Sequence, residues 1–406
     1  MTVADVADYR WLVGEEAAEV LTAHADVADP LALVARLRKT LPAARAALVA
    51  EQIGLRRRAG AKFPDAAQMF FTSVGLEQAT DFVTARYKAQ RFPIGGRYVD
   101  LCCGIGGDLV AIGERGETVG YDRDPVTALF AEANARVAAT PGAAIYPTSV
   151  IAESASAAQV AAVAAWHIDP DRRPQGRRTT QLELHEPSLD AMEQMLAANG
   201  NAAIKLAPGS APPEAWQTRA ECEWISRAGE CKQLVLWFGT LATDVGMRRA
   251  TLLTSDGTSH SITGAPDDMA HPDAFEQVAA DFGRYLFEPD AAVLAAHLTK
   301  STARRFAIAP LHVGSAYLTG DAPLIDPLLA TFEILEALPL DARKLRAWFA
   351  ERNIGQLEIK KRGVDVEPEK LRRELKLSGR ESGCLILVRR GDRVTALAAR
   401  RLVSPA

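Results

Sequence analysis

A glycine-rich turn at residues 100–108 is the part of this sequence whose residue types and spacing could do chemistry. It reads Asp-Leu-Cys-Cys-Gly-Ile-Gly-Gly-Asp, and the apolar residues 109–112 that follow are typical of a helix start. A strand that enters a helix through glycines lets the backbone approach a ligand, because a side chain there would collide with it. A second apolar run ends at Asp122, 18 residues after Gly104 (122 − 104). An acid at this strand end could accept hydrogen bonds from both hydroxyls of a ribose, which indicates a nucleoside-containing cofactor.

The spacing distinguishes two classes of cofactor. A dinucleotide fingerprint that begins at Gly104 needs its third glycine at position 109, where this chain has Leu109. A pyrophosphate also has no use for an acid just before the turn, where Asp100 stands. The observed form, Asp-x-x-x-Gly-x-Gly, suits a cofactor that carries an amino acid and a sulfonium instead of phosphates. The alternative is an ordinary tight turn in an α/β domain, and the two acids argue against it.

This stretch resembles the first motif of class I S-adenosyl-L-methionine (SAM) methyltransferases, and Asp122 matches the acid of their second motif. The resemblance implies that Asp100 belongs to the cofactor site. It also implies that Gly104 and Gly106 approach the methionine part of SAM, while Asp122 holds the ribose. In an open α/β sheet, ligands lie beyond the carboxyl ends of the strands at the switch in strand order. Four side chains at or near such ends are therefore expected to converge on one crevice: Asp100, Asp122, Asp169 and Lys205.

Asp169 and Pro170 follow the fourth predicted strand, residues 163–168. Methyl transfer from a sulfonium is an in-line displacement, for which the protein aligns the acceptor and, where necessary, removes a proton. Enzymes that methylate an amino group on a base often have Asp/Asn-Pro-Pro-aromatic here, but this chain continues with Asp171 and Arg172. The departure argues against an exocyclic amine as the acceptor. We predict Asp169, with Pro170, to orient the acceptor or accept its proton; a structural turn-capping role is the alternative.

Cationic side chains near these motifs are predicted substrate contacts. A loop with Pro174 and Gly176 carries four guanidinium groups suited to phosphate, those of Arg172, Arg173, Arg177 and Arg178. Lys205 could meet the acceptor or a cofactor carboxylate, although a solvent-facing strand tip is equally consistent with its position. We interpret His167 as a strand residue and not as a catalytic base. The alternative for the arginines is a solvated basic loop paired with acids.

The elements that must position these residues follow from the hydrophobic pattern. Residues 1–92 are predicted to be helical, with Asp29-Pro30 opening one helix and Leu33 and Leu37 sharing one face. From residue 93 strands alternate with helices, which favours a mainly parallel sheet covered on both faces. A hairpin around Gly229 is expected at the edge of this sheet. The fold class is therefore α/β, and the resemblance implies a Rossmann-like class I methyltransferase sheet.

The third strand is where the resemblance is incomplete. The weak apolar run Ala143–Tyr146 is the predicted strand, and Pro147 follows it with no acid until Glu153. Class I enzymes often place an acid directly after this strand, where it meets the adenine amine. A hydroxyl of Thr148 could substitute, or the cofactor site could be weak or vestigial.

The last 75 residues or so form a compact α+β module in the predicted order β-α-β-α-β-β. From residue 341 onward the chain has 17 Lys and Arg against 9 Asp and Glu, a local charge of +8. The net charge of the whole chain is −4, so residues 1–340 carry −12. Such asymmetry favours a basic module that meets a polyanion, with a merely soluble basic surface as the alternative. The best phosphate contacts in this module are predicted to be Lys360, Lys361 and Arg362, beside Gly363.

Taken over nearly its full length, the chain resembles bacterial, largely actinobacterial, SAM-dependent methyltransferases with a C-terminal THUMP-like domain. The motifs that carry the resemblance are residues 75–80, 100–108, 169–173, 285–290 and 357–363. True THUMP domains bind RNA in RNA-modifying enzymes, so the resemblance implies an RNA substrate, transfer or ribosomal RNA. The implied domains are a helical domain (1–92), the methyltransferase domain (93–245), a linking extension (246–325) and the THUMP-like domain (326–406).

Composition excludes other classes of protein. At 48% hydrophobic and 24% charged residues, with no secretory signal or membrane-length apolar run, the chain is expected to be a cytoplasmic globular protein. Five cysteines without a C-x-x-C pair favour reduced thiols and predict no metal site. The sequence does not specify the oligomeric state. The rival functions are methylation of a small molecule or protein, and RNA binding by a protein with a vestigial SAM site.

Overall fold

The computed structural model describes residues 4–27, 29–137, 146–171, 180–265, 278–312, 315–390 and 393–402. Two compact units make up the chain. The first comprises residues 1–222, 233–246 and 255–257, and the second comprises residues 223–232, 247–254 and 258–406.

The amino-terminal segment is helical, as predicted. Its helices are α1 (Val6–Leu12), α2 (Glu15–Ala23), α3 (Pro30–Leu37), α4 (Ala43–Ala59), α5 (Ser73–Gln78) and α6 (Phe82–Ala89). The Asp29 carboxylate caps α3 by accepting the N–H groups of Leu31 and Ala32, and Leu33 and Leu37 are buried on its inner face. The predicted helix start at Asp29-Pro30 is therefore confirmed.

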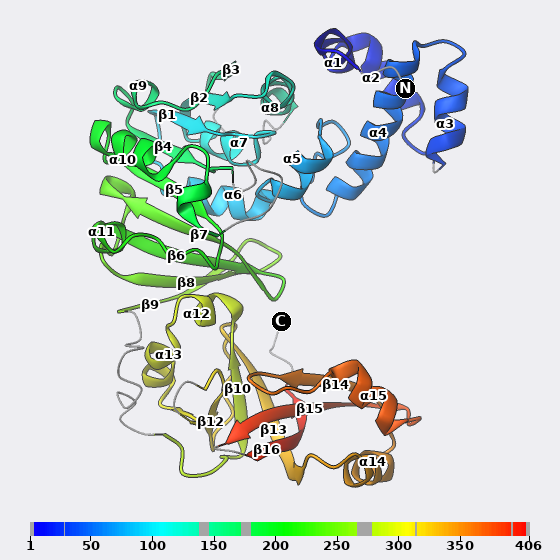
Figure 1. Cartoon of the computed structure of the whole chain (residues 1–406), viewed down its shortest axis with the longest axis vertical. Helices are drawn as coiled ribbons and strands as arrows, with labels where there is room; N and C mark the ends of the chain where they lie inside the picture. The colour runs from blue at the N-terminus through cyan, green and yellow to red at the C-terminus, as the bar shows by residue number, and fades with distance from the viewer. Residues whose placement is uncertain are drawn as a thin grey trace. The chain divides into compact units, whose positions relative to one another are not determined.

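A mainly parallel sheet confirms the predicted α/β class. Among the described residues, nine strands pair in the order β3-β2-β1-β4-β5-β7-β6-β8-β9 (Figure 1). Their bounds are β1 (Gly96–Leu101), β2 (Gly116–Asp122), β3 (Thr148–Ala152), β4 (Ala165–Ile168), β5 (Ala202–Leu206), β6 (Ala220–Arg227), β7 (Glu230–Phe238), β8 (Arg248–Leu253) and β9 (Ser259–Gly264). Strands β1 to β5 are parallel, and β7 pairs antiparallel with β5. The strand order reverses between the parallel neighbours β1 and β4, and such sheets bind ligands at this switch point.

The helices of this sheet are α7 (Gly107–Gly113), α8 (Pro125–Val137), α9 (Ala157–Val160), α10 (Leu189–Ala198) and α11 (Glu214–Arg219). Helix α7 begins directly after the glycine-rich turn, and Asp108 stands in its first turn. Asp124 caps α8 by accepting the N–H of Thr127 at 2.7 Å. Helix α6 packs against α7, which brings part of the amino-terminal segment to the glycine-rich turn.

Two sequence expectations need correction. The strand that pairs with β2 is Thr148–Ala152, which begins after the predicted run 143–146, and residues 143–145 of that run lie outside the described residues. The β6–β7 hairpin is not the sheet edge, because β8 and β9 continue the same sheet. The predicted linking extension contains two short helices, α12 (Ala291–Ala295) and α13 (Thr299–Phe306).

A second sheet contains the carboxyl-terminal module. Seven strands among the described residues pair in the order β11-β12-β10-β13-β16-β15-β14. Their bounds are β10 (Tyr285–Pro289), β11 (Ala309–Pro310), β12 (Leu318–Gly320), β13 (Leu329–Pro339), β14 (Ile354–Lys361), β15 (Glu381–Arg390) and β16 (Arg393–Arg401). The predicted order β-α-β-α-β-β is confirmed by β13-α14-β14-α15-β15-β16.

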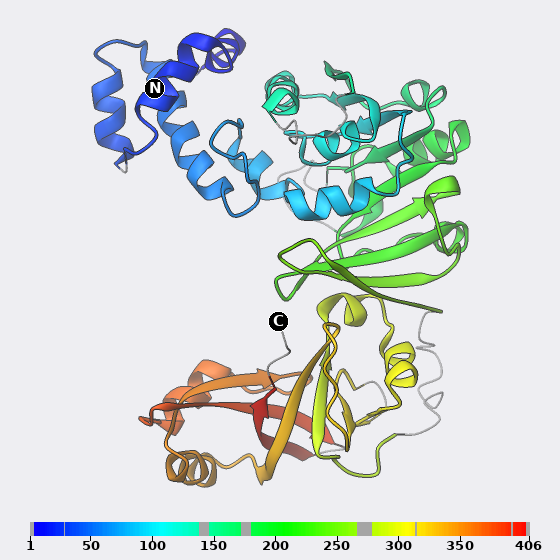
Figure 2. The same ribbon diagram turned by 180° about the vertical axis from the view of Figure 1, so that it is seen from behind.

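The two helices of this module lie side by side against the sheet (Figures 1 and 2). They are α14 (Ala342–Glu351), capped by Asp341, and α15 (Pro368–Leu375). Leu345 and Leu375 are fully buried between these helices and the strands. Their inner faces are thereby used for packing, and the charged side chains of both helices remain on the outside.

Candidate functional site

A cleft of about 510 Å³ opens at the carboxyl ends of β1, β2 and β4. Of the predicted site residues, five line it: Asp100, Gly104, Asp122, Asp169 and Pro170. The structure therefore brings together the acids of three strand ends, as the topology predicted. Gly106 and Lys205 are not among the lining residues. Arg172 and Arg173 lie outside the described residues.

The glycine-rich turn presents bare backbone to this cleft. Gly104 has a φ of +55°, and a Cβ built on it would meet no other heavy atom within 4 Å. Gly106 has a φ of +90°, and a Cβ there would face Ala131 of α8 at 3.5 Å. Both conformations are left-handed and favour glycine, but only Gly104 opens on the cleft. Gly106 therefore shapes the turn from behind.

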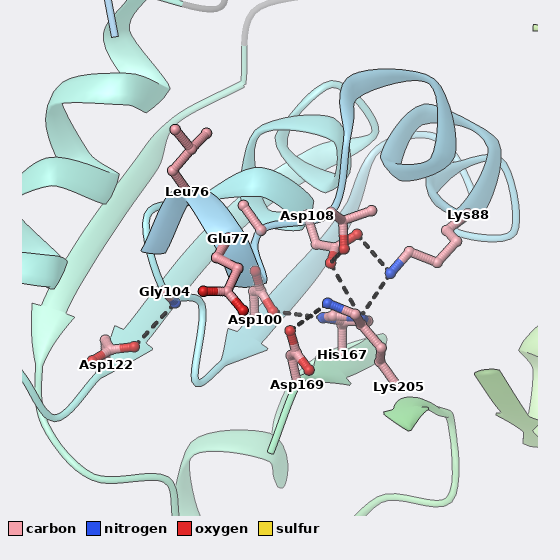
Figure 3. Close-up of polar contacts among 12 residues, drawn as sticks. Leu76, Glu77, Lys88, Asp100, Gly104, Asp108, Asp122, His167, Asp169 and Lys205 are labelled. Carbon is pink, nitrogen blue, oxygen red and sulfur yellow. Dashed lines mark hydrogen bonds and ion pairs between the residues drawn. The ribbon is translucent and has the colours of Figure 1, made fainter. Parts of the chain in front are cut away.

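Asp122 is fixed by two backbone donors at the end of β2. Its Oδ2 accepts the N–H of Gly104 at 3.0 Å, and its Oδ1 accepts the N–H of Asp124 at 3.0 Å (Figure 3). Burial raises the pKa of Asp122, while the Asp124 and Gly104 amides oppose that shift. A carboxylate offers about four acceptor positions, so each oxygen can still accept a further donor from a ligand.

A buried charged cluster forms part of the cleft wall, where Asp100, Asp108 and His167 line the cleft (Figure 3). His167 Nδ1 is 2.7 Å from Asp100 Oδ1, and Lys88 Nζ is 2.7 Å from Asp108 Oδ1. The Thr80 hydroxyl donates to Asp108 Oδ2 at 2.6 Å. Burial raises the pKa of Asp100 against the lowering effect of His167. For Asp108, burial acts in the same direction, but the Lys88 ammonium holds its pKa well below the usual range.

Asp169 and Lys205 form an ion pair beside this cluster. Lys205 Nζ is 2.5 Å from Asp169 Oδ2, and the Lys205 side chain is only 7% exposed while that of Asp169 is 26% exposed. Lys205 is therefore a nearly buried partner of Asp169 and not a solvent-facing strand tip. His167 is a buried strand residue, as predicted, but it also touches the charged cluster. Asp171 pairs with Arg123 at 3.2 Å at the cleft wall.

The predicted phosphate contacts of the tail have different environments. Lys360 Nζ lies 2.6 Å from Glu288 Oε2, and Arg362 lies 3.4 Å from Glu288 Oε1. Lys361 is exposed, and no ion pair joins it to any residue that the structure describes. Two of the three cations are thus partly neutralised within the module, while Lys361 keeps its charge at the surface.

Sequence reasoning missed several residues of the cleft. Glu153 follows the corrected third strand directly and lines the cleft, so an acid does stand after β3. Helix α5 contributes Val74 and Gly75 to the wall, although no residue of 1–92 was predicted to belong to the site. Lys88 was missed because its partner Asp108 is close in space but belongs to another helix. The position of Glu153 could have been found by extending the strand to residues 148–151, three of which are β-branched (Thr148, Val150 and Ile151).

The cleft fits a cofactor with a cationic group and a ribose. Asp100 Oδ2 is buried and has no hydrogen-bond partner among the described residues, so an anionic acceptor is left over at the cleft wall. The open space at Gly104 leaves room for a ligand against the backbone. No group of three or more His, Cys, Asp or Glu side chains among the described residues is placed to hold a metal ion. No helix among them is long and apolar enough to cross a membrane.

Comparison with known proteins agrees with this geometry. Residues 329–401 match the model of the THUMP domain-like family. An uncharacterized S-adenosylmethionine-dependent methyltransferase of Mycobacterium tuberculosis strain H37Rv is 32% identical over 357 residues, which are 86% of this chain and 94% of the relative. The protein of the same description from strain CDC 1551 gives the same values. A crystal structure of a candidate methyltransferase from Porphyromonas gingivalis W83 has the same fold, with a TM-score of 0.80 at 21% identity over 99% of this chain and 100% of that chain.

Proposed function

We propose that this chain, which belongs to the family of S-adenosylmethionine-dependent methyltransferases, transfers the methyl group of SAM to a base of transfer or ribosomal RNA. One observation carries the proposal: a cleft with acids at three strand ends occurs in the same chain as a THUMP-like module at residues 329–401. The family membership supports the reaction. The module and its excess of positive charge support RNA as the substrate.

The cofactor supplies a methyl group that is already activated on a sulfonium. The chain's own residues would bind and orient it. Asp122 would accept the ribose hydroxyls with its remaining lone pairs, and Asp100 Oδ2 would accept the ammonium of the methionine part. Gly104 would let that part lie against the backbone, with Gly106 holding the turn. Glu153, which follows β3 and lines the cleft, would accept a hydrogen bond from the adenine amine.

Asp169 is the proposed acceptor-orienting residue. It lines the cleft at the end of β4, and the ring of Pro170 restricts the backbone next to it. Its carboxylate would align the acceptor atom and, where the acceptor carries a proton, take that proton. Lys205 holds Oδ2 in an ion pair and thereby orients the carboxylate. The substitution of Asp171 and Arg172 for Pro and an aromatic residue favours an acceptor other than an exocyclic amine.

RNA docking is assigned to the carboxyl-terminal module. Exposed cations are present on α14, on α15 and its C-cap, and at the end of β14, and we call this set the basic surface: Arg343, Lys344, Lys361, Lys370, Arg373 and Lys376. Lys360 and Arg362 would support it by holding β14 to Glu288. Arg172 and Arg173 are proposed to contact phosphates beside the reacting base. Contacts of this kind position a nucleic acid without reading its sequence.

Each of the four proposed domains would have its own role in the reaction. Residues 93–245 would carry out methyl transfer, and residues 326–406 would hold the RNA. Residues 1–92 would complete the cleft wall through α5, and residues 246–325 would connect the catalytic and RNA-binding parts.

Mass spectrometry of RNA nucleosides tests this function. RNA from a strain that lacks the gene is compared with RNA from its parent and from strains that re-express variants. We expect one methylated nucleoside to be absent, and to return with wild type and with Asp81→Asn. Asp81 caps α6 and does not line the cleft, so it is a matched control for Asp169→Asn and Asp122→Asn, which should not restore the nucleoside. Identical nucleosides in deletion and parent strains would overturn RNA as the substrate.

A further inference from the structure

Lys88 is a buried cation that has no direct place in the proposed methyl transfer. Its side chain comes from α6 and is only 3% exposed. Nζ lies 2.7 Å from Asp108 Oδ1 and 3.4 Å from His167 Nε2. Burial of an ammonium is costly unless it is paired and hydrogen-bonded, and burial accordingly lowers the pKa of Lys88 against the opposing pull of Asp108. A buried cation at this position therefore acts strongly on its neighbours.

The contacts around His167 select one neutral tautomer. A neutral imidazole can donate its Nδ1–H to Asp100 Oδ1 over the observed 2.7 Å. The Lys88 ammonium is a donor only, so the facing Nε2 must be the acceptor of the ring. Asp108 Oδ2 is 3.8 Å from Nε2, beyond hydrogen-bond length, and already accepts the Thr80 hydroxyl. The geometry thus leaves no partner for a second proton on the ring.

The state of His167 determines the charge that Asp100 presents to the cleft. Asp100 uses Oδ1 for His167, while Oδ2 is buried and without a hydrogen-bond partner among the described residues. Beside a neutral imidazole the carboxylate keeps its full negative charge. Beside an imidazolium that charge would be neutralised, and the attraction for a cationic ligand would be lost.

We propose that Lys88 is a positioning residue for the cofactor. By pairing with Asp108 and directing its ammonium at His167 Nε2, Lys88 keeps His167 neutral. It thereby keeps Asp100 Oδ2 anionic for the ammonium of the methionine part of SAM. This inference rests on the SAM cofactor and the proposed role of Asp100, and is independent of the RNA substrate.

Removal of the Lys88 charge should make cofactor binding depend on pH. The charged groups that face His167 are Asp100 from β1, Asp108 from α7 and Lys88 from α6, with the Asp169–Lys205 ion pair beside them. In Lys88→Met the imidazole faces two carboxylates, and its own cationic partner is gone. Without the Lys88 ammonium, nothing on that side of the ring opposes a second proton on Nε2, and an imidazolium would neutralise Asp100. Affinity for SAM falls as the pH decreases and recovers as it rises.

Calorimetric titration of the full chain with SAM at pH 6.5 and 8.5 measures this effect. We expect the wild-type Kd to differ less than about twofold between the two pH values. The Kd of Lys88→Met should be about tenfold higher at pH 6.5 than at pH 8.5, the factor that corresponds to one pKa unit of coupling. Lys88→Arg should restore a flat profile. Lys88→Met combined with His167→Gln should also be flat, because the titrating ring is absent. Arg86→Met is the matched control, since Arg86 is on the same helix and pairs with Glu114 at 3.2 Å outside the cluster.

Nitrogen NMR of His167 in the cofactor-free wild-type protein provides a second readout that needs no variant. The proposal predicts a neutral ring with its proton on Nδ1 at pH 7.5. A doubly protonated ring at that pH would overturn it. An equal loss of affinity in Lys88→Met at both pH values would also overturn it, because a purely structural role predicts that result. If the wild-type protein does not methylate RNA, while SAM binding by wild type and Lys88→Met shows the expected pH profiles, only the proposed substrate is refuted.

Discussion

Replacement of Asp122 by Asn tests the proposed ribose contact in the cleft. Both carboxylate oxygens already accept a backbone N–H at 3.0 Å, and one further donor on each would be a ribose hydroxyl. Asn keeps one oxygen, presents an NH₂ donor in place of the other and removes the charge. Hydrogen bonds to charged groups contribute about 1.5–3 kcal/mol each. Loss of one such bond and weakening of the second should cost about 2–3 kcal/mol, or roughly a 30- to 150-fold increase in Kd.

Calorimetric titration with two ligands distinguishes the ribose from the sulfonium as the contact. S-adenosyl-L-homocysteine has the same ribose as SAM but lacks the sulfonium charge, so Asp122→Asn should weaken both ligands by the same factor. Asp81→Asn, outside the cleft, should bind both as wild type does. Burial raises the pKa of Asp122, so its ionised form opposes folding above that pKa, and the neutral Asn should not lower the Tm through loss of charge. A Kd within twofold of wild type, or a loss confined to SAM, would refute the ribose assignment.

Further predictions concern the turn, the buried pair, the acceptor site and the tail. Gly104→Val should abolish detectable SAM binding in calorimetry, because its side chain enters the cleft, and the left-handed φ should cost about 1–2 kcal/mol of stability in urea unfolding. Asp108→Asn should cost about 3–5 kcal/mol at pH 7 by leaving Lys88 unpaired. The pKa of Asp108 in the folded protein lies below its usual value of 3.8. The stabilisation by the Asp108 carboxylate is therefore complete above pH 3.8 and is lost as the pH falls through the lower folded-state pKa. In urea unfolding, the difference in stability between variant and wild type should accordingly shrink only below about pH 3.8. Asp169→Asn should lower kcat at least about tenfold in a methylation assay with SAM affinity unchanged, since proton transfer contributes about 10²–10⁴-fold where it is needed. Lys361→Glu should weaken RNA binding in filter assays and reduce the salt slope by about 1, whereas an unchanged slope would remove Lys361 from the basic surface.

The sequence predicted the parts of the site that depend on local pattern. The glycine-rich turn and Asp122 were identifiable because strand ends and tight turns have fixed residue preferences over short spans. The helix start at Asp29 was predicted correctly for the same reason. The third strand was misplaced because Pro147 and the polar residues after it are typical of a turn, and the error hid the position of Glu153.

Residues whose roles depend on distant partners could not be predicted. Lys88 has the pattern of an exposed residue in the last turn of a helix, and only the packing of α6 on α7 places it beside Asp108. Lys360 and Arg362 have the pattern of free phosphate contacts, but β10 brings Glu288 to them from more than 70 residues earlier. In each case the partner is set by tertiary structure, which a single sequence does not encode as a local signal.

Transfer of labelled methyl groups tests the central claim most directly. Purified protein is incubated with methyl-labelled SAM and with total RNA, total protein or small-molecule extract from a strain that lacks the gene. The account predicts label in RNA of the deletion strain, little in RNA of the parent strain whose site is already methylated, and none with Asp122→Asn at SAM concentrations near the wild-type Kd. Label in the protein or small-molecule fraction, with none in RNA, would contradict it.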